Sequence, residues 1–127
     1  EKLDIFASGS VDLSYSSHLL EHILYANVPA TLREWMRVTK AGVHVVLYLP
    51  DEEEYPKVGE KGANPDHKHN INIPFVVDAM KKLGGWDLVR CEKRNEEREY
   101  SIFFVFQKLA HIQVFILLSL ADGDIYF

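Results

Sequence analysis

Four segments of the chain have the pattern of apolar and polar positions that is typical of β-strands. In the first, Val11, Leu13 and Tyr15 alternate with polar residues, so this strand would have one apolar face. The second, Val43–Leu49, is apolar at nearly every position, which favours a strand covered on both faces in a parallel sheet. The last two are separated by a short charged turn, which predicts an antiparallel hairpin. The predicted strands are residues 11–16, 43–49, 86–92 and 100–108.

Two helices are predicted between the first and second strands. The hydroxyl of Ser16 or Ser17 can accept a hydrogen bond from the free N–H groups of a first turn, so a helix would start there and end near Asn27. The next helix would open at Pro29, whose missing N–H is not needed in a first turn, and would stop at Gly42. A crossover of this kind is what two parallel strands require.

The segment of residues 51–72 has no regular periodicity, because glycines and prolines interrupt it. Loops of this length are uncommon inside a compact domain and are often functional. We expect Glu52–Asn70 to be more mobile than the rest of the chain. A third helix begins at Pro74 and ends at Gly84. This order of elements predicts an α/β domain whose mostly parallel sheet ends in an antiparallel hairpin.

Composition and charge narrow the classes of partner. The 127 residues are 47% hydrophobic and 26% charged, which is ordinary for one soluble globular domain. The net charge of −5 argues against binding to nucleic acid or to a membrane, and no apolar stretch is long enough to span a bilayer. The single cysteine, Cys91, fits a reducing compartment, and Glu1–Asp4 is too charged for a signal peptide. We therefore expect a cytoplasmic protein.

Two sequence segments carry motifs whose order suggests a family. Residues 11–23 read VDLSYSSHLLEHI, and residues 33–51 read REWMRVTKAGVHVVLYLPD. The first resembles the fourth strand and following helix of class I S-adenosylmethionine (SAM)-dependent methyltransferases, and the second resembles their Arg-Val-Leu-Lys-Pro-Gly-Gly segment and fifth strand. The resemblance implies a partial Rossmann-like methyltransferase sheet in a domain of residues 1–108. Residues 109–127 would be an apolar C-terminal extension.

The 127 residues do not hold the glycine-rich segment that binds SAM in that family. Their glycines do not form a G-x-G-x-x-G motif after a strand. The resemblance therefore implies a SAM-dependent methyltransferase-like domain that lacks its cofactor-binding half. We expect it neither to bind SAM nor to be active alone. The alternative is a non-catalytic oligomeric or protein-interaction domain derived from a methyltransferase. The sequence does not indicate the methyl acceptor, which would be a small molecule or a protein.

Candidate catalytic residues follow the first predicted strand. His18 and Glu21 lie after its carboxyl end, where substrates bind in such sheets. By the resemblance, His18 would be the general base for a hydroxyl or ammonium acceptor, with Glu21 beside it. Ser17 and His18 would contact SAM if the missing half were supplied. The alternative is structural: Glu21 and His22 would cap and pack the helix, and His18 would be a first-turn residue.

The irregular loop contains residues that could bind a metal ion. Asp66, His67 and His69 are possible zinc ligands, and the two histidines would share one face of an extended segment. No third ligand follows at a standard spacing, and the neighbouring residues are typical of turns. The sequence therefore predicts no metal site.

Self-association is predicted from two apolar features. In the resembled fold, the strand at residues 11–16 pairs on its outer side with the family's first strand, which is not in this sequence. An unpaired edge of this kind recruits another chain or is covered. The apolar run Leu109–Leu120 would also need cover from water, and its pattern fits a strand or a helix. We expect a homodimer that uses Leu109–Leu120 and the strand edge.

Overall fold

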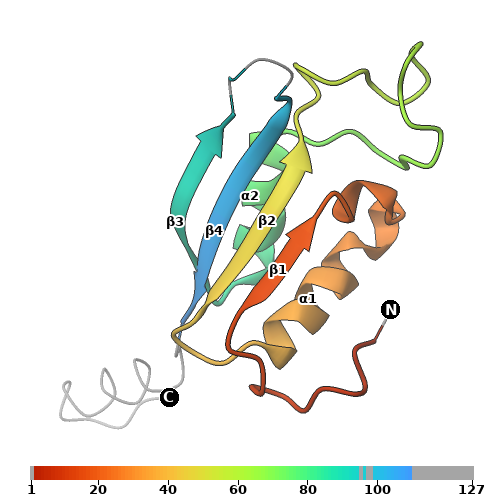
Figure 1. The fold of residues 1–127 in the computed structure, drawn as a ribbon. Coiled ribbons are helices and arrows are strands. Elements are labelled where there is room, and N and C mark those ends of the chain that lie inside the picture. Colours follow the sequence, from red (N-terminus) through yellow and green to blue (C-terminus); the bar gives the residue numbers. More distant parts are fainter. Residues whose placement is uncertain (1, 95, 97–98, 110–127) are drawn as a thin grey trace, which may run out of the picture.

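The computed structural model describes residues 2–94, 96 and 99–109 of the chain (Figure 1). The described part is a single four-stranded sheet with two α-helices and two 3₁₀ turns. Beyond Leu109, the predicted C-terminal extension lies outside the described residues. The elements are β1 (Ser14–Ser17), η1 (Leu20–His22), η2 (Tyr25–Asn27), α1 (Val28–Val38), β2 (His44–Pro50), α2 (Ile73–Leu83), β3 (Trp86–Lys93) and β4 (Ser101–Lys108).

The strand order in the sheet is β1-β2-β4-β3 (Figure 1). β1 and β2 are parallel, with Ser14 opposite Val45, and the α1 region forms the crossover between them. β4 is antiparallel to both of its neighbours, β2 and β3. The last strand therefore runs against the other three and is inserted between β2 and β3. The predicted α/β class, the parallel pair and the antiparallel hairpin are all confirmed.

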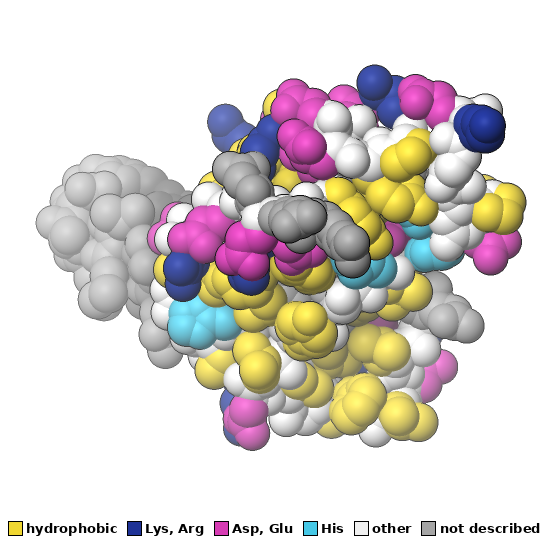
Figure 2. Space-filling view, turned by 45° about the horizontal axis from the view of Figure 1, so that its top comes forward, with side chains coloured by type: hydrophobic (Ala, Val, Ile, Leu, Met, Phe, Trp, Pro, Cys, Tyr) yellow, Lys and Arg dark blue, Asp and Glu magenta, His cyan; other side chains and the backbone are white. Residues whose placement is uncertain are grey.

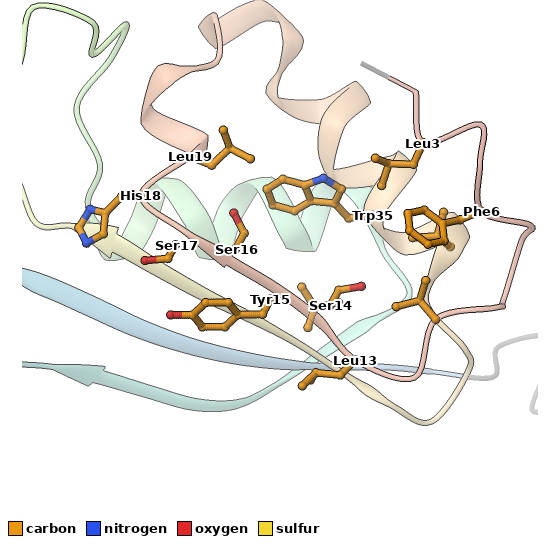
Figure 3. Close-up of a pocket in the computed structure, with 13 residues that line it drawn as sticks. Leu3, Phe6, Leu13, Ser14, Tyr15, Ser16, Ser17, His18, Leu19 and Trp35 are labelled. Atoms are coloured by element: carbon orange, nitrogen blue, oxygen red, sulfur yellow. The ribbon is translucent and has the colours of Figure 1, made fainter.

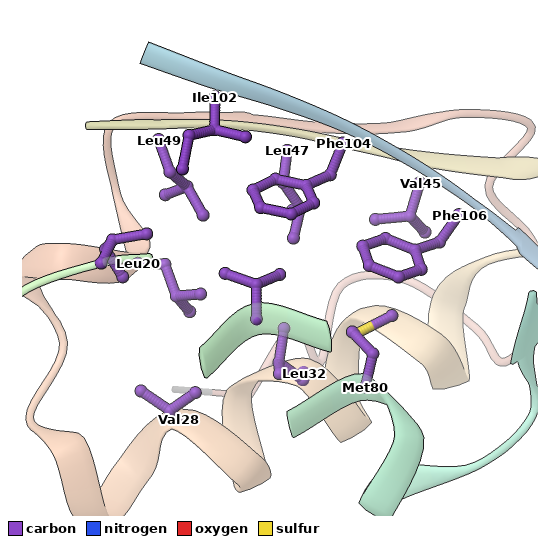
Figure 4. Packing of buried hydrophobic residues seen from close by; sticks show 12 residues of the cluster. Leu20, Val28, Leu32, Val45, Leu47, Leu49, Met80, Ile102, Phe104 and Phe106 are labelled. Atoms are coloured by element: carbon purple, nitrogen blue, oxygen red, sulfur yellow. The ribbon is translucent and has the colours of Figure 1, made fainter. Parts of the chain in front are cut away.

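Both α-helices pack on the same face of the sheet (Figure 4). Pro29 lies in the first turn of α1, where its missing N–H needs no partner. Asn72 caps α2, because its side-chain oxygen accepts a hydrogen bond of 2.8 Å from the Phe75 N–H. The apolar sides of the helices and of β2 and β4 form one core. Its buried members are Leu20, Val28, Leu32, Val45, Leu47, Leu49, Ile71, Val76, Met80, Ile102, Phe104 and Phe106.

The opposite face of the sheet is only partly covered by described residues. In β2, Val45, Leu47 and Leu49 are buried, whereas Val46 and Tyr48 are partly exposed. The prediction that β2 is fully covered on both faces is therefore wrong for the described part of the chain.

Hydrophobic side chains gather over one region of the surface, with charged groups toward its rim (Figure 2). No described helix is long and apolar enough to cross a membrane.

The segment after the first strand differs from the prediction. The strand is Ser14–Ser17 rather than residues 11–16, and Val11 forms only an isolated bridge with Thr39. The backbone stays in the ladder up to His18, whose N–H donates to the Tyr48 carbonyl at 2.8 Å. No serine is therefore free to cap a helix there, and the predicted α-helix of residues 16–27 is instead the pair of 3₁₀ turns η1 and η2.

The end of α1 is also earlier than predicted. The helix stops at Val38, because Thr39 is extended and takes part in the bridge to Val11. Gly42 has a φ of +85° and makes the turn into β2 rather than ending the helix. The left-handed conformation explains the glycine at this position.

Candidate active site at the carboxyl ends of the parallel strands

The carboxyl ends of β1 and β2 lie at the same edge of the sheet because the two strands are parallel. His18 follows β1 directly with a φ of +50°, in the left-handed region that is rare for a side chain other than glycine. This turn leads the chain straight into η1, which carries Glu21 and His22. The backbone of the loop after β2 is anchored on η1: the Lys68 N–H donates to the Glu21 carbonyl at 2.7 Å.

Three imidazoles surround the carboxylate of Glu21. The Glu21 side chain is fully buried, and its Oε1 lies 3.4 Å from His18 Nδ1, 3.8 Å from His67 Nε2 and 3.9 Å from His22 Nε2. Neither carboxylate oxygen has a hydrogen-bond partner among the described residues. The side chains of His18 and His22 are about one-third exposed, whereas that of His67 is 9% exposed. The cluster therefore has a buried wall and an accessible side.

Burial lowers the pKa of His67 below its ordinary value, and the nearby Glu21 charge only partly opposes this effect. Aromatic rings shield this histidine: the centroid of the His22 ring lies 4.8 Å away and that of Tyr55 5.3 Å away. Burial therefore favours the neutral form of the imidazole, in which one ring nitrogen can accept a proton or a metal ion.

His18 also contacts the end of the antiparallel strand. Its Nε2 lies 3.2 Å from Ser101 Oγ, and its ring is edge-on to the rings of Tyr48 and Tyr100. The Tyr48 hydroxyl donates to the Glu99 carboxylate. That hydrogen bond, together with burial, raises the pKa of Tyr48 above its ordinary value. The imidazole of His18 thus lies between Glu21, near its Nδ1, and Ser101, near its Nε2.

A cleft of about 490 Å³ runs along β1 (Figure 3). Leu3 and Phe6 of the N-terminal segment and Trp35 of α1 form part of its apolar lining. Ser17 and His18 line it at the carboxyl end of the strand. The cleft thus connects an apolar groove with the histidine cluster.

The outer edge of β1 has no paired strand among the described residues. His18 directs its N–H toward β2. Backbone groups alternate in direction along a strand, so Tyr15 and Ser17 direct theirs to the open edge. The Tyr15 side chain is 63% exposed. The edge and the cleft beside it are therefore available to another strand.

The structure brings together the two residues predicted to be catalytic, His18 and Glu21. It separates His67 and His69, the two histidines of the loop that are possible zinc ligands by sequence. His67 joins Glu21, whereas His69 Nε2 lies 3.0 Å from the Leu20 carbonyl oxygen. The ligand atoms of Glu21, His22 and His67 all lie within 4.8 Å of one another. The Glu-His pair was visible in the sequence, but no spacing rule links it to a histidine in a distant loop.

Comparisons with known proteins agree on one fold. Residues 1–47 match the sequence profile of a family described as a methyltransferase domain. A SAM-dependent methyltransferase from Mesorhizobium loti superposes with a TM-score of 0.64 at 16% identity, over 81% of this chain and 64% of that one. A SAM-dependent methyltransferase from Archaeoglobus fulgidus gives a TM-score of 0.64 at 14% identity, over 84% of this chain and 63% of that one.

A third similar structure contains ligands. It is a 1,6-didemethyltoxoflavin-N1-methyltransferase from Burkholderia thailandensis with bound 1,6-didemethyltoxoflavin and S-adenosylhomocysteine. It superposes with a TM-score of 0.62 at 10% identity, over 81% of this chain and 46% of that one. The chain thus spans less than two-thirds of the length of these structures. No curated protein sequence matches it. The fold is a partial Rossmann-like methyltransferase fold, and the likeness at this identity concerns the fold alone.

Proposed function

We propose that this chain, which has a methyltransferase-like fold, forms the acceptor side of a SAM-dependent methyltransferase. The observation that carries the proposal is the His18–Glu21 pair at the carboxyl end of β1, with the His18 Nδ1 and the Glu21 Oε1 3.4 Å apart. In open α/β sheets this end of the strands is where ligands bind.

In this proposal, His18 is the general base. Its Nε2 would leave Ser101 Oγ and take a proton from a hydroxyl or ammonium acceptor placed in the cleft. The buried Glu21 carboxylate beside Nδ1 would hold the ring in place and stabilise the imidazolium. When bound, SAM supplies the methyl group. The partly apolar cleft beside His18 would hold the acceptor and keep water away from it.

The described residues supply contacts for only one side of a SAM-binding site. Ser17 and His18 line the cleft beside the open edge of β1 and would contact the cofactor there. No glycine-rich turn follows a strand in the 127 residues. We propose that the chain alone neither binds SAM nor transfers methyl groups, and that a strand carrying the glycine-rich half pairs with the outer edge of β1.

Calorimetric titration of the isolated chain with SAM tests the first part. We expect no binding with a dissociation constant below about 10 µM, which is roughly −7 kcal/mol. Tighter binding would contradict the proposal that SAM binding requires the glycine-rich half. The gene sequence upstream of the Glu1 codon tests the second part. An in-frame strand followed by a glycine-rich turn supports the proposal, and a start codon close to Glu1 opposes it.

The base assignment is tested in the protein that includes the glycine-rich half. His18→Gln should lower kcat at least 100-fold, since general acid–base catalysis contributes about 10²–10⁴. His44→Gln is the matched control, because His44 is an exposed histidine at the start of β2. A His18→Gln variant that folds and keeps normal kcat would exclude His18 as the base.

A second candidate function is a non-catalytic oligomeric domain, and the open edge of β1 favours it. In this case a second copy of the chain would pair along that edge and give a twofold dimer. Leu109–Leu120 was predicted to contribute, and it lies outside the described residues except for Leu109. Light scattering at about 10 µM distinguishes the candidates. A homodimer of the isolated chain supports this one, and a monomer contradicts it.

A further inference from the structure

The Glu21 carboxylate is the least satisfied charged group in the described part of the chain. The side chain is fully buried, and neither oxygen accepts a hydrogen bond. A buried carboxylate is strongly disfavoured unless a positive charge or several donors compensate for lost hydration. Three imidazole nitrogens lie 3.4–3.9 Å from Oε1, which is too far for good hydrogen bonds. This arrangement leaves room for a cation between the carboxylate and the rings.

The groups are spaced somewhat more widely than the ligands of a bound metal ion. Two ligands that each lie about 2.0–2.1 Å from a tetrahedral zinc ion lie roughly 3.3 Å apart. Glu21 Oε1 is 3.8 Å from His67 Nε2 and 3.9 Å from His22 Nε2, and the ligand atoms of all three residues lie within 4.8 Å of one another. The side chains would therefore have to close by roughly 0.5–1.5 Å to supply three of the four zinc ligands. The three residues come from η1 and from the loop that is anchored on it by the Lys68–Glu21 backbone hydrogen bond.

We propose that Glu21, His22 and His67 bind a divalent transition-metal ion of the zinc class. Two histidines and one glutamate are a ligand set of open zinc sites, and such nitrogen-rich sets disfavour magnesium and calcium. The side chain of His22 is 30% exposed, which leaves a route for the ion and a position for a water or oxygen ligand.

This inference goes beyond methyl transfer and does not depend on it. His18 Nδ1 lies 3.4 Å from the same Oε1 and adjoins the open position. It is not one of the three ligands, whose atoms are mutually within 4.8 Å. Metal binding can therefore be measured on the isolated chain without SAM or an acceptor, so its outcome is separate from that of the proposed function.

Zinc titration of the metal-stripped full chain is the direct test. We expect one Zn²⁺ per chain with a dissociation constant below about 1 µM at pH 7.5. His67→Gln and His22→Gln should each weaken binding at least tenfold. His44→Gln, which removes an exposed histidine at the start of β2, should leave it unchanged. Circular dichroism of each variant shows whether the fold is kept.

The wild-type chain gives an independent measurement if the variants do not fold. Co²⁺ in a four-coordinate site of nitrogen and oxygen ligands should produce visible absorption bands that an equivalent of Zn²⁺ removes. Wild-type binding weaker than about 100 µM, or an equal loss of affinity in His44→Gln, would overturn the proposal. The absence of the Co²⁺ bands would overturn it as well. In that case a protonated histidine would be the counter-charge of Glu21.

Discussion

Phe103 and Phe104 are adjacent in β4 and point to opposite faces of the sheet, which makes them a sharp test of how the two faces are covered. Phe104 is fully buried on the helix side, opposite Leu47 of β2, and its ring stacks with that of Phe106 at a centroid distance of 6.1 Å. Phe103 is partly exposed on the other face and has an edge contact with the Tyr48 ring at 6.3 Å.

Replacing each with alanine should have unequal effects on the free energy of unfolding. Phe104→Ala removes a fully packed ring, which costs about 3–5 kcal/mol. Phe103→Ala removes a ring with contacts on one side only, so about half of that, roughly 2 kcal/mol, is expected. A domain of this size has a total stability of about 5–15 kcal/mol, so Phe104→Ala would remove a large fraction of it.

Urea unfolding followed by the fluorescence of Trp35 and Trp86 measures the difference. With a slope of about 2 kcal/mol per molar urea, the Phe104→Ala midpoint should fall by about 2 M and the Phe103→Ala midpoint by about 1 M. An equal or larger loss for Phe103→Ala would refute the reasoning, because it would mean that something covers this face in solution. A loss that grows with protein concentration would identify a second copy as that cover.

Four further predictions concern single sites and one segment. Asn72→Ala should destabilise the chain by about 1 kcal/mol through loss of the α2 cap and Asn72→Gly by only a few tenths, as thermal unfolding can measure. Gly42→Ala should lower the free energy of unfolding by about 1–2 kcal/mol, because alanine is strained at φ +85°. No clash is expected, since no atom outside the neighbouring residues lies within 4 Å of the added carbon, and an unchanged unfolding temperature would contradict the prediction. The hydrogen bond from Arg37, with a second from the Leu3 N–H, lowers the pKa of Glu34 from 4.5 to about 2. The ionised Glu34 side chain therefore stabilises the folded chain fully above pH 4.5, and this stabilisation is lost as the pH falls through 2. Glu34→Gln should therefore lower the urea midpoint at pH 7 but not near pH 2, and an equal effect at both would be inconsistent with that shift. Amide exchange should be faster over Glu52–Asn70 than over β2, and equal protection would disprove the predicted mobility.

The strands and α-helices were predictable because their burial patterns are local. The apolar runs of β2 and β4, the proline in the first turn of α1 and the glycine after α2 each specify an element without distant information. The segment from Ser16 to Asn27 was predicted wrongly because tertiary contacts overrode its helical pattern. The ladder between His18 and Tyr48 keeps the chain extended where a cap was expected. Propensity is a weak guide where a neighbouring strand competes for the same backbone groups.

The candidate site was predictable only in part. His18 and Glu21 are three residues apart and follow a strand, so their proximity could be inferred from the sequence. His67 is brought to Glu21 by the fold of the loop, where Lys68 and His69 both contact the backbone of η1. Contacts of this kind depend on loop geometry, which apolar periodicity does not encode. The sequence therefore predicted that His18 and Glu21 lie together, but not the cluster around the carboxylate.

The position of β4 has a consequence for how the protein is made. β4 is the last of the four strands to leave the ribosome, yet it occupies the place between β2 and β3. Until residues 101–108 emerge, β2 and β3 lack their common partner, and the edge of β2 that pairs with β4 stays open on the nascent chain. Pairing between strands far apart in sequence is slow and leaves such intermediates open to aggregation. The sheet is therefore most prone to aggregation just before β4 emerges from the ribosome. A chaperone that shields the edge of β2 would have its greatest effect on yield at that stage.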